Sequence, residues 1–351
     1  MSVYEYVGNL HVHTCYSDGT ARHSEVAQAA TEAGIDFVVV TDHNVWVDGV
    51  EGYYGETLLL VGEELHDVRC RPQASHLLAF QAEAELAPLV SDPQATVNEV
   101  GRQGGFCFLA HPFERNSPID PELDAILWND WDVTGYTGIE LWNYMSEFKG
   151  LLRSRLAALF YAYFPAIGIR GPYRRTLRQW DELLIDGNRV SAIGGADAHG
   201  KTYSLGPLSR KVFPYSYLFR CVNTHVLTEL PLNGELSRDK ELIYNSLKAG
   251  RTWVGYDLPA SSSGFEFRAR SGANEALIGE ELVRAGAVVF KVRTPRSADI
   301  RLIRDGETVA RSQGQTLEYT TARDGTYRVE AYRRHWLERR GWIFSSPVYV
   351  K

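Results

Sequence analysis

The stretch Ile35-Asp36-Phe37-Val38-Val39-Val40-Thr41-Asp42-His43-Asn44 is the most informative part of the chain for the fold. Its first half is a nearly continuous apolar run rich in β-branched residues, which is typical of a strand buried on both faces of a parallel sheet. An acidic residue and a histidine follow directly. The stretch therefore predicts a buried strand with chemically active side chains at its carboxyl end.

The same alternation extends outward from this stretch over residues 1–258. Apolar runs of strand length occur at 10–13, 58–61, 76–80, 106–110, 138–142 and 191–195. Helices are expected at 24–33, with Ser24 as N-cap and Gly34 as terminator, and near 96–103, 147–163, 176–185 and 238–249;. Alternating strands and helices over this length favour an α/β fold with a parallel sheet or barrel. Functional sites of such barrels lie at the C-terminal ends of the strands.

The character of the sequence changes at Pro259-Ala260-Ser261-Ser262-Ser263-Gly264, which has the composition of a linker;. Short segments with alternating polarity follow at 265–270, 288–292, 300–304, 317–320, 327–332 and 342–350. Asp305-Gly306 and Asp324-Gly325 between them are hairpin signals;. We therefore expect one large domain at 1–258 and a small C-terminal antiparallel β-sandwich at 265–351.

Bulk properties restrict the class of protein and of partner. The formal net charge is −7, which argues against a nucleic-acid polymer as partner;. The four cysteines show no Cys-x-x-Cys spacing, so neither a disulfide framework nor a thiolate zinc site is expected;. Residues 1–10 lack the features of a signal peptide, and no apolar run approaches the ~18 residues of a membrane span;. We expect a cytoplasmic protein without a membrane partner, and the oligomeric state stays open.

Histidines and acidic residues gather at the apolar runs. His11 and His13 are two residues apart, so on a strand they share a face, and Asp197 and His199 repeat this spacing after two glycines;. Each motif alone has an ordinary explanation, such as a turn aspartate for Asp18. Six such clusters are harder to explain by packing, because ionisable groups are seldom buried without partners. The candidate donors are His11, His13, Asp18, His43, Glu63 or Glu64, His76, His111, Asp197 and His199. Imidazole and carboxylate are ligands of borderline divalent metals.

The combined pattern His-x-His-x4-Asp-Gly, Thr-Asp-His, Gly-x-Glu, a lone strand histidine, Ala-His-Pro and Gly-Gly-x-Asp-x-His resembles the polymerase and histidinol phosphatase (PHP) family over about residues 1–255. The resemblance implies a distorted (β/α)7 barrel with two to three divalent metal ions (Mn, Fe or Zn). It selects Glu64 over Glu63, because the family spacing is Gly-x-Glu. It implies one metal at His11, His13, Glu64 and Asp197, a second at Glu64, His76 and His111, and a third at Asp18, His43 and His199. Many members carry histidine where this chain has Asp18, and an oxygen ligand there favours manganese or iron over zinc.

The end of the chain is similar to one branch of this family. The segment Leu247-Lys248-Ala249-Gly250-Arg251-Thr252 and the ending Trp342–Val350 resemble the CehA/McbA-type metallohydrolases. That branch includes enzymes that cleave carbamate esters. The resemblance therefore leaves both phosphate and carbonyl esters open as substrates.

Basic residues near these motifs are candidates for substrate binding. Arg170, Arg174 and Arg175 lie in a short insertion between two expected barrel elements, and Lys201 follows a metal motif closely;. A solvated basic turn is the ordinary alternative for the arginines. Glu140 and Asn143 are candidates for orienting ligand imidazoles. His66 and His225 are candidates for protonating a leaving group, with an ordinary structural histidine as the alternative.

Three functional hypotheses follow. The leading one is a metal-dependent phosphoesterase acting on a phosphomonoester or phosphodiester of a small molecule through activated water, with His11, Asp18, His43, Glu64, Asp197 and His199 as catalytic residues. The second is a carboxyl or carbamate ester hydrolase with the same metal centre. The third is a non-catalytic metal-binding module, which is disfavoured because every expected ligand position carries a competent donor.

Overall fold

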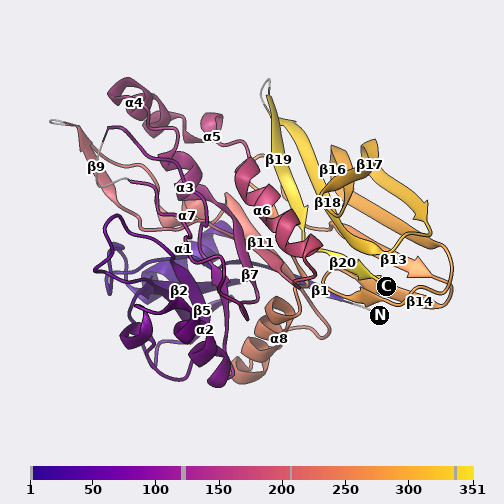
Figure 1. The fold of residues 1–351 in the computed structure, drawn as a ribbon. Coiled ribbons are helices and arrows are strands. Elements are labelled where there is room, and N and C mark those ends of the chain that lie inside the picture. The colour runs from indigo at the N-terminus through magenta and orange to yellow at the C-terminus, as the bar shows by residue number, and fades with distance from the viewer. Residues whose placement is uncertain (1–2, 120–123, 206–207, 336–337) are drawn as a thin grey trace.

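The computed structural model describes residues 3–119, 124–205, 208–335 and 338–351. Figure 1 shows the orange and yellow C-terminal strands on one side of the molecule, with helix α6 (Arg174–Ile185) between them and the strands of the N-terminal part. The N-terminal strands are β1 (Tyr4–Asn9), β2 (Phe37–His43), β3 (Gly52–Tyr54), β4 (Thr57–Leu65), β5 (Leu77–Phe80), β6 (Phe106–Leu109), β7 (Gly138–Asn143), β8 (Ser191–Gly195), β9 (Thr202–Leu205), β10 (Leu208–Lys211), β11 (Val222–Thr228) and β12 (Thr252–Tyr256).

The remaining helices are short to medium in length. They are α1 (His23–Ala33), α2 (Pro93–Arg102), α3 (Tyr144–Lys149), α4 (Arg155–Tyr163), α5 (Pro165–Gly168), α7 (Tyr215–Leu218) and α8 (Leu236–Lys248), with a 3-10 turn at Ala87–Leu89. Helix α1 ends at Gly34, which adopts φ 77°, as predicted;. Its N-cap is Arg22 rather than Ser24, because Glu25 reaches back to the Arg22 backbone N–H at 2.7 Å;.

The N-terminal sheet is mixed, whereas the alternation of strands and helices favoured a parallel sheet or barrel. Strands β1, β2 and β4 pair in parallel, as do β6, β7 and β8. Strand β5 joins the two groups through antiparallel pairing with β4 and β6. On the other side β1 pairs with β11, and β11 with β12, both antiparallel. Most of β2 and all of β4 are buried, in agreement with their apolar runs.

The two ends of this sheet approach one another through side chains. Thr224 Oγ1 on β11 donates to the carbonyl of Gly194 on β8 at 2.7 Å, and Thr252 Oγ1 on β12 donates to the Ala192 carbonyl at 2.9 Å. These bonds curve the sheet around the core. The distorted (β/α)7 barrel itself stays a prediction.

Two predicted elements are wrong in detail. The first strand spans Tyr4–Asn9 rather than 10–13, because the Asn9 side chain turns to the Val222 carbonyl and the Ala196 N–H and the chain then leaves the ladder. The predicted helix at 147–163 is two helices, α3 and α4. Ser154 starts the second by accepting a hydrogen bond from the Ala157 N–H at 3.1 Å, as an N-cap does;.

The C-terminal part is built of strands only. They are β13 (Glu266–Ser271), β14 (Asn274–Leu277), β15 (Glu281–Leu282), β16 (Val288–Arg304), β17 (Glu307–Thr321), β18 (Gly325–His335), β19 (Glu338–Ser345) and β20 (Val348–Val350). All of their recorded pairs are antiparallel except β15 with β20. The predicted hairpin at Asp305-Gly306 is confirmed, and both residues have positive φ;. The predicted strands at 288–292 and 300–304 are one strand, β16, with an irregular register between them.

A core of its own lies between these strands, with Phe267, Phe290, Tyr327 and Trp342 among its largest members. Strand β19 also pairs with β12, so the sheet continues across the predicted boundary near 258–265. The division into two domains stays a prediction. Within the described ranges, none of the helices has the length and apolar character that a membrane crossing requires.

Candidate metal centre

Two loop segments carry four of the expected donors and lie side by side. Val12 bridges Ala198, the His13 N–H donates to the Ala198 carbonyl at 2.9 Å, and the Ala198 N–H donates to the His11 carbonyl at 3.2 Å. This short parallel contact replaces the predicted strand at 10–13. It aligns His11 and His13 with Asp197 and His199.

The backbone at this contact is close and strained. A Cβ atom on Gly195 would lie 2.7 Å from Glu140 Oε1 and 2.8 Å from the His11 Cβ, so only glycine fits there;. Asp197 has φ 55° and His111 has φ 25°, in a region that non-glycine residues seldom adopt;. Strained residues of this kind cluster at functional sites.

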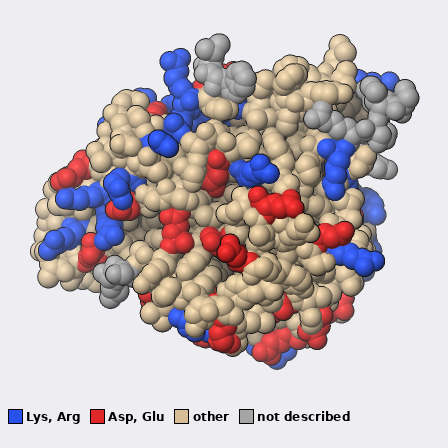
Figure 2. Space-filling view, turned by 180° about the vertical axis from the view of Figure 1, so that it is seen from behind, with Lys and Arg blue, Asp and Glu red and all other residues tan. Residues whose placement is uncertain are grey.

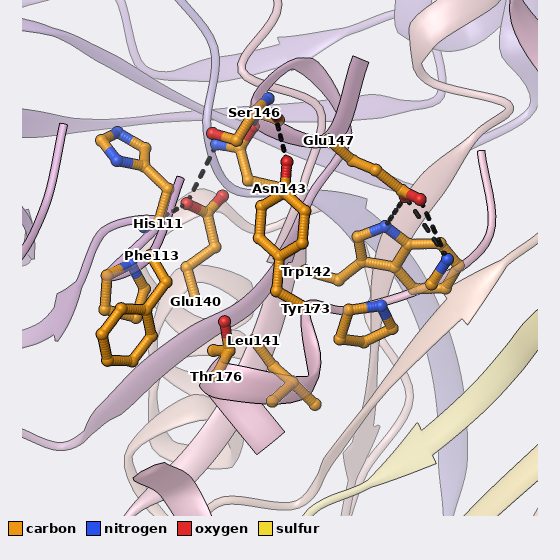
Figure 3. A pocket seen from close by; sticks show the side chains of 13 residues that line it. His111, Phe113, Glu140, Leu141, Trp142, Asn143, Ser146, Glu147, Tyr173 and Thr176 are labelled. Carbon is orange, nitrogen blue, oxygen red and sulfur yellow. Dashed lines mark hydrogen bonds between the residues drawn. The ribbon is translucent and has the colours of Figure 1, made fainter. Parts of the chain in front are cut away.

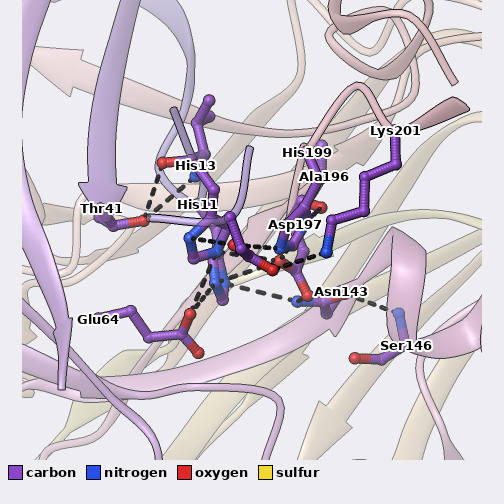
Figure 4. Close-up of polar contacts among 12 residues, drawn as sticks. His11, His13, Thr41, Glu64, Asn143, Ser146, Ala196, Asp197, His199 and Lys201 are labelled. Atoms are coloured by element: carbon purple, nitrogen blue, oxygen red, sulfur yellow. Dashed lines mark hydrogen bonds and ion pairs between the residues drawn. The ribbon is translucent and has the colours of Figure 1, made fainter. Parts of the chain in front are cut away.

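Glu64, at the end of β4, is the centre of the cluster. Its Oε2 lies 3.0 Å from His11 Nε2, 3.2 Å from His13 Nε2 and 3.1 Å from His43 Nδ1. Its Oε1 lies 2.7 Å from His76 Nδ1 and 3.0 Å from His111 Nε2. Figure 4 shows the Glu64 carboxylate pointing toward the His11 and His13 rings. Glu63 points elsewhere, and its Oε2 accepts the Leu86 N–H.

Asp18 forms a second, more open side of the cluster. Its Oδ1 lies 3.1 Å from His199 Nε2 and 3.7 Å from His43 Nε2, and its Oδ2 accepts from Lys201 Nζ at 2.7 Å. Asp197 Oδ1 lies 3.2 Å from His13 Nε2 and 3.5 Å from His199 Nδ1. The structure thus brings all nine predicted donors together. Their role as metal ligands stays a prediction.

Several of these imidazole nitrogens are buried and lack a hydrogen-bond partner. They are His11 Nε2, both ring nitrogens of His13, His43 Nδ1, His76 Nε2 and His111 Nδ1. Three of them, His11 Nε2, His13 Nε2 and His43 Nδ1, are close to a carboxylate oxygen in distance but do not point at it in a hydrogen-bonding direction. Buried polar atoms without partners are costly and call for an explanation. Donor atoms within 4.8 Å of one another form groups that suit a metal ion, among them His11, His13 and Asp197, and His13, Asp18, His43 and His199.

The electrostatics act in opposite directions on the individual donors. Burial lowers the pKa of His11, His13 and His111, but nearby carboxylates outweigh it and raise all three, so these imidazoles must lose a proton to bind a metal;. Burial lowers the pKa of His43 to about 2 and that of His66 to about 4, so both imidazoles are neutral near pH 7. Burial works against charge on Glu64, but the surrounding histidines hold the pKa of its carboxyl well below the usual range. Neutral imidazoles and ionised carboxylates are the metal-binding forms of these side chains.

Glu140 and Asn143, on β7, support the cluster from behind. Glu140 Oε1 lies 3.1 Å from His11 Nδ1, and Oε2 accepts the His111 N–H at 2.9 Å and Asn143 Nδ2 at 3.0 Å. These contacts fix the ring of His11, as a ligand-orienting carboxylate would. Glu140 and Asn143 also line a cavity whose volume is about 240 Å³, including space open to solvent. Phe113, Trp142 and Tyr173 form other parts of its wall (Figure 3).

The predicted substrate-binding residues are dispersed. Lys201 lies at the cluster, next to Asp18. Arg170 turns away to Glu338 of β19, with 2.8 Å between Nη2 and Oε2. Arg175 lies over the Phe113 ring, 4.3 Å from its centre, and Arg174 is exposed at the start of α6. The structure therefore brings Lys201 to the cluster and does not bring Arg170 there.

Two residues contribute more than their sequence context indicated. The His66 ring stacks on His76 at 4.2 Å, and its donor atoms group with those of His43 and His76. Tyr215 Oη donates to the carbonyls of His13 and His199, both at 2.8 Å, and so holds the two donor loops together. His66 follows Glu64 by two residues on an extended segment, a spacing that places it on the same side. No local signal marks Tyr215.

Comparisons with known proteins agree with the cluster's composition. Residues 9–84 match the family model of the PHP domain. This segment contains His11, His13, Asp18, His43, Glu64 and His76. The chain is thus similar to PHP domains over this segment. The CehA/McbA-type branch stays a prediction.

Solved structures are similar at low identity. One is a two-domain protein from Bacteroides vulgatus ATCC 8482 that contains a predicted PHP-like metal-dependent phosphoesterase, with 14% identity, 98% of this chain and 95% of that chain covered, and a TM-score of 0.47. Another is a proposed metal-dependent phosphoesterase from Bifidobacterium adolescentis ATCC 15703, with 16% identity, 57% and 90% covered, and a TM-score of 0.35. No curated protein matches this chain.

Proposed function

We propose that this protein is a metal-dependent hydrolase that cleaves phosphoester bonds of small molecules. The observation that carries the proposal is the Glu64 carboxylate, which lies within 3.2 Å of nitrogens from five histidines. In a chain without metal, so many buried imidazoles around one carboxylate would leave nitrogen atoms unsatisfied, as several are here;. The PHP-domain match over residues 9–84 supports the same proposal.

The donor set fits two to three divalent ions such as manganese, iron or zinc. His11, His13, Glu64 and Asp197 would hold one ion, Glu64, His76 and His111 a second, and Asp18, His43 and His199 a third. When bound, such ions supply a water of lowered pKa and positive charge for the phosphoryl oxygens. The mixed imidazole and carboxylate set, without cysteine, leaves the identity of the metal open among these three;.

Other residues of the chain would bind and orient the substrate. Lys201, with 42% of its side chain exposed, would leave Asp18 to contact a phosphoryl oxygen;. Glu140 contacts His11 Nδ1, so it fixes the direction of the His11 ring, and it accepts from the His111 backbone N–H, so it holds the main chain at His111 in place;. His66 borders the cluster as a neutral imidazole and would move a proton only after a substrate group raises its pKa;.

A substrate panel tests the proposal. The protein is purified without chelator, its metals are measured by elemental analysis, and p-nitrophenyl phosphate, bis-p-nitrophenyl phosphate and a naphthyl ester are compared. We expect metal-dependent release of p-nitrophenol from a phosphate ester, and loss of turnover and of bound metal in His11→Ala.

The other outcomes separate the alternatives. Cleavage of the naphthyl ester alone would replace the phosphoesterase by a carboxyl or carbamate ester hydrolase. Bound metal without turnover of any ester would favour a non-catalytic module. Normal turnover in His11→Ala would contradict the proposed centre.

A further inference from the structure

The hairpin of β18 and β19 places arginines opposite one another. Its register pairs Arg333 with Arg340 and Arg334 with Arg339. Like charges directly opposite on antiparallel strands are destabilising. Each such pair therefore needs negative charge nearby.

Only one of these four arginines has a carboxylate partner in the described part of the chain. Arg339 Nη1 lies 2.8 Å from Asp299 Oδ2. Arg333 donates to the Ser297 carbonyl at 3.2 Å and lies over the Trp342 ring, 4.7 Å from its centre. Among the described residues, no ion pair joins Arg333, Arg334 or Arg340 to an acid. These three arginines thus have no carboxylate within ion-pair distance. Arg340 does act at longer range on the buried carboxyl of Glu147, whose pKa is raised by burial and lowered in part by the Arg340 charge.

Arg340 is the most deeply buried of the three. Its residue is only 2% exposed, and its two terminal nitrogens donate to the neutral carbonyls of Ala166 and Ile167. Its Nε is buried and has no hydrogen-bond partner. A buried guanidinium without a carboxylate in direct contact is costly, because carbonyl groups do not neutralise its charge.

The three arginines line one cavity, which we call the arginine pocket. It has a volume of about 320 Å³, including space open to solvent, and its other walls include Pro259, His335 and Trp342. No acidic side chain is among its described lining residues. Figure 2 shows Lys and Arg side chains at the top of the molecule, on the side of the C-terminal strands.

The pKa shifts of two residues at the pocket also reflect nearby positive charge. The pKa of His335 is lowered by burial and by the charges of Arg340 and Arg333. The pKa of Arg333 is lowered by burial and by the charge of Arg296. Burial is the larger cause of both shifts, and the positive charge of neighbouring arginines adds to it;.

We propose that the arginine pocket binds a phosphate group of a small soluble ligand. Guanidinium groups offer planar pairs of donors that match phosphate oxygens, and three of them around one cavity suit an anion with two or more charges. A single carboxylate would neutralise only one of the three. The inference does not depend on the proposed hydrolase function, because none of these arginines contacts the metal centre.

Titration calorimetry with inorganic pyrophosphate tests the proposal on the full chain with its metals. We expect the double variant Arg333→Gln/Arg334→Gln to lose about tenfold or more in affinity at one site, since two of the three charges are removed. The matched control Arg270→Gln/Arg323→Gln removes two exposed arginines elsewhere in the C-terminal part and should bind as the unmodified protein does.

Pyrophosphate can also bind at the metal centre, so all three proteins are compared again with His11→Ala added. The pocket's contribution should persist there even if the hydrolase proposal fails. If the double variant does not fold, Arg334→Gln alone, at an exposed position, should still weaken binding severalfold. Equal affinities of variant and control in both backgrounds would overturn the proposal.

Two further probes fix the class of ligand. Malonate, a dicarboxylate, should bind more weakly than pyrophosphate, and tighter binding of malonate would contradict a phosphate site. Vesicles with phosphatidic acid test a lipid headgroup as the source of the phosphate. Binding to these vesicles that depends on Arg333 and Arg334, without binding of free pyrophosphate, would overturn a soluble ligand.

Discussion

Glu64 shows how one residue can organise a site. A carboxylate has about four lone-pair directions and can approach several cations or donors at once. Here five histidines from four segments surround it, and burial makes each unsatisfied nitrogen costly;. The neighbouring Glu63 carries the same carboxyl group but points to the opposite face of the strand, because successive side chains alternate between faces. The pair therefore offers a matched test of position.

Glu64→Gln should remove bound metal and lower kcat/KM roughly 100-fold or more, beyond the 10–100-fold typical of residues that only orient a ligand. The amide keeps the size of the side chain and removes its charge. Elemental analysis and steady-state kinetics measure both effects.

Glu63→Gln is the control and should keep both metal and activity. Burial raises the pKa of Glu63 to about 7, so this carboxyl is already partly protonated at neutral pH, and glutamine replaces it with little change in charge. A metal content that falls equally in both variants would contradict a central role for Glu64.

The sequence predicts the donors better than it predicts their support. His11, His13, Asp197 and His199 lie in short motifs with a fixed spacing, so local patterns find them. Tyr215 is found only in the structure, because its hydroxyl joins loops that are 186 residues apart at His13 and His199. Such a contact has no sequence pattern, since it depends on how α7 packs.

At the level of elements, strands are joined by buried ion pairs in addition to apolar packing. His225, on β11, is fully buried, with Nδ1 2.8 Å from Glu5 of β1 and Nε2 3.0 Å from Asp257 just after β12. Its ring also stacks on Trp253 at 4.8 Å. These contacts tie the three strands together and make an ordinary structural role the better interpretation of His225. These contacts of His225 involve none of the donors around Glu64.

The stability of this strand group should depend on pH. Burial lowers the pKa of His225, but Asp257 and Glu5 outweigh it and raise that pKa from 6.5 to about 9. A pKa that is higher in the folded state stabilises the fold fully below pH 6.5, and this contribution is lost as pH rises through 9. It amounts to roughly 3 kcal/mol of unfolding free energy.

Denaturant unfolding of the wild type and His225→Gln between pH 6 and pH 10 measures this contribution. The variant should be less stable at pH 6, and the gap should shrink as pH approaches 10. A gap that is constant with pH would contradict a charged His225.

The strands also show which elements the sequence predicts correctly and which it does not. The apolar runs of β2, β4 and β7 identify buried strands because burial on both faces needs a continuous apolar sequence. The strand at 10–13 was wrong because Asn9 uses its side chain to leave the ladder, a choice decided by Val222 and Ala196 far along the chain. Strand β16 was divided in two because its middle, around Pro295, is polar where the register shifts.

The whole molecule is held together by contacts that cross the predicted domain boundary. Strand β12 pairs with β19 through Trp253–Gly255 and Ile343–Ser345. Arg328 of β18 is 2% exposed and donates to Asp181 of α6 at 2.7 and 2.9 Å. The C-terminal strands therefore cover an edge and a helix of the N-terminal part, which a linker composition at 259–264 did not reveal.

Deleting residues 265–351 should therefore destabilise the part that holds the donors, although no donor is removed. The deletion leaves β12 with an unpaired edge. It also uncovers Trp253, which packs on Phe265, and Trp142, which packs on Phe344, and open edges with apolar surface promote aggregation;. We expect residues 1–264 to be largely insoluble, or to have a melting temperature well below that of the full chain.

The substitution Asp181→Asn in the full chain should lower the melting temperature by a smaller amount than the deletion, because Arg328 keeps Glu330 as a partner;. A soluble fragment 1–264 that melts with the full chain and binds the same metals would establish the N-terminal part as an independent domain and contradict this expectation.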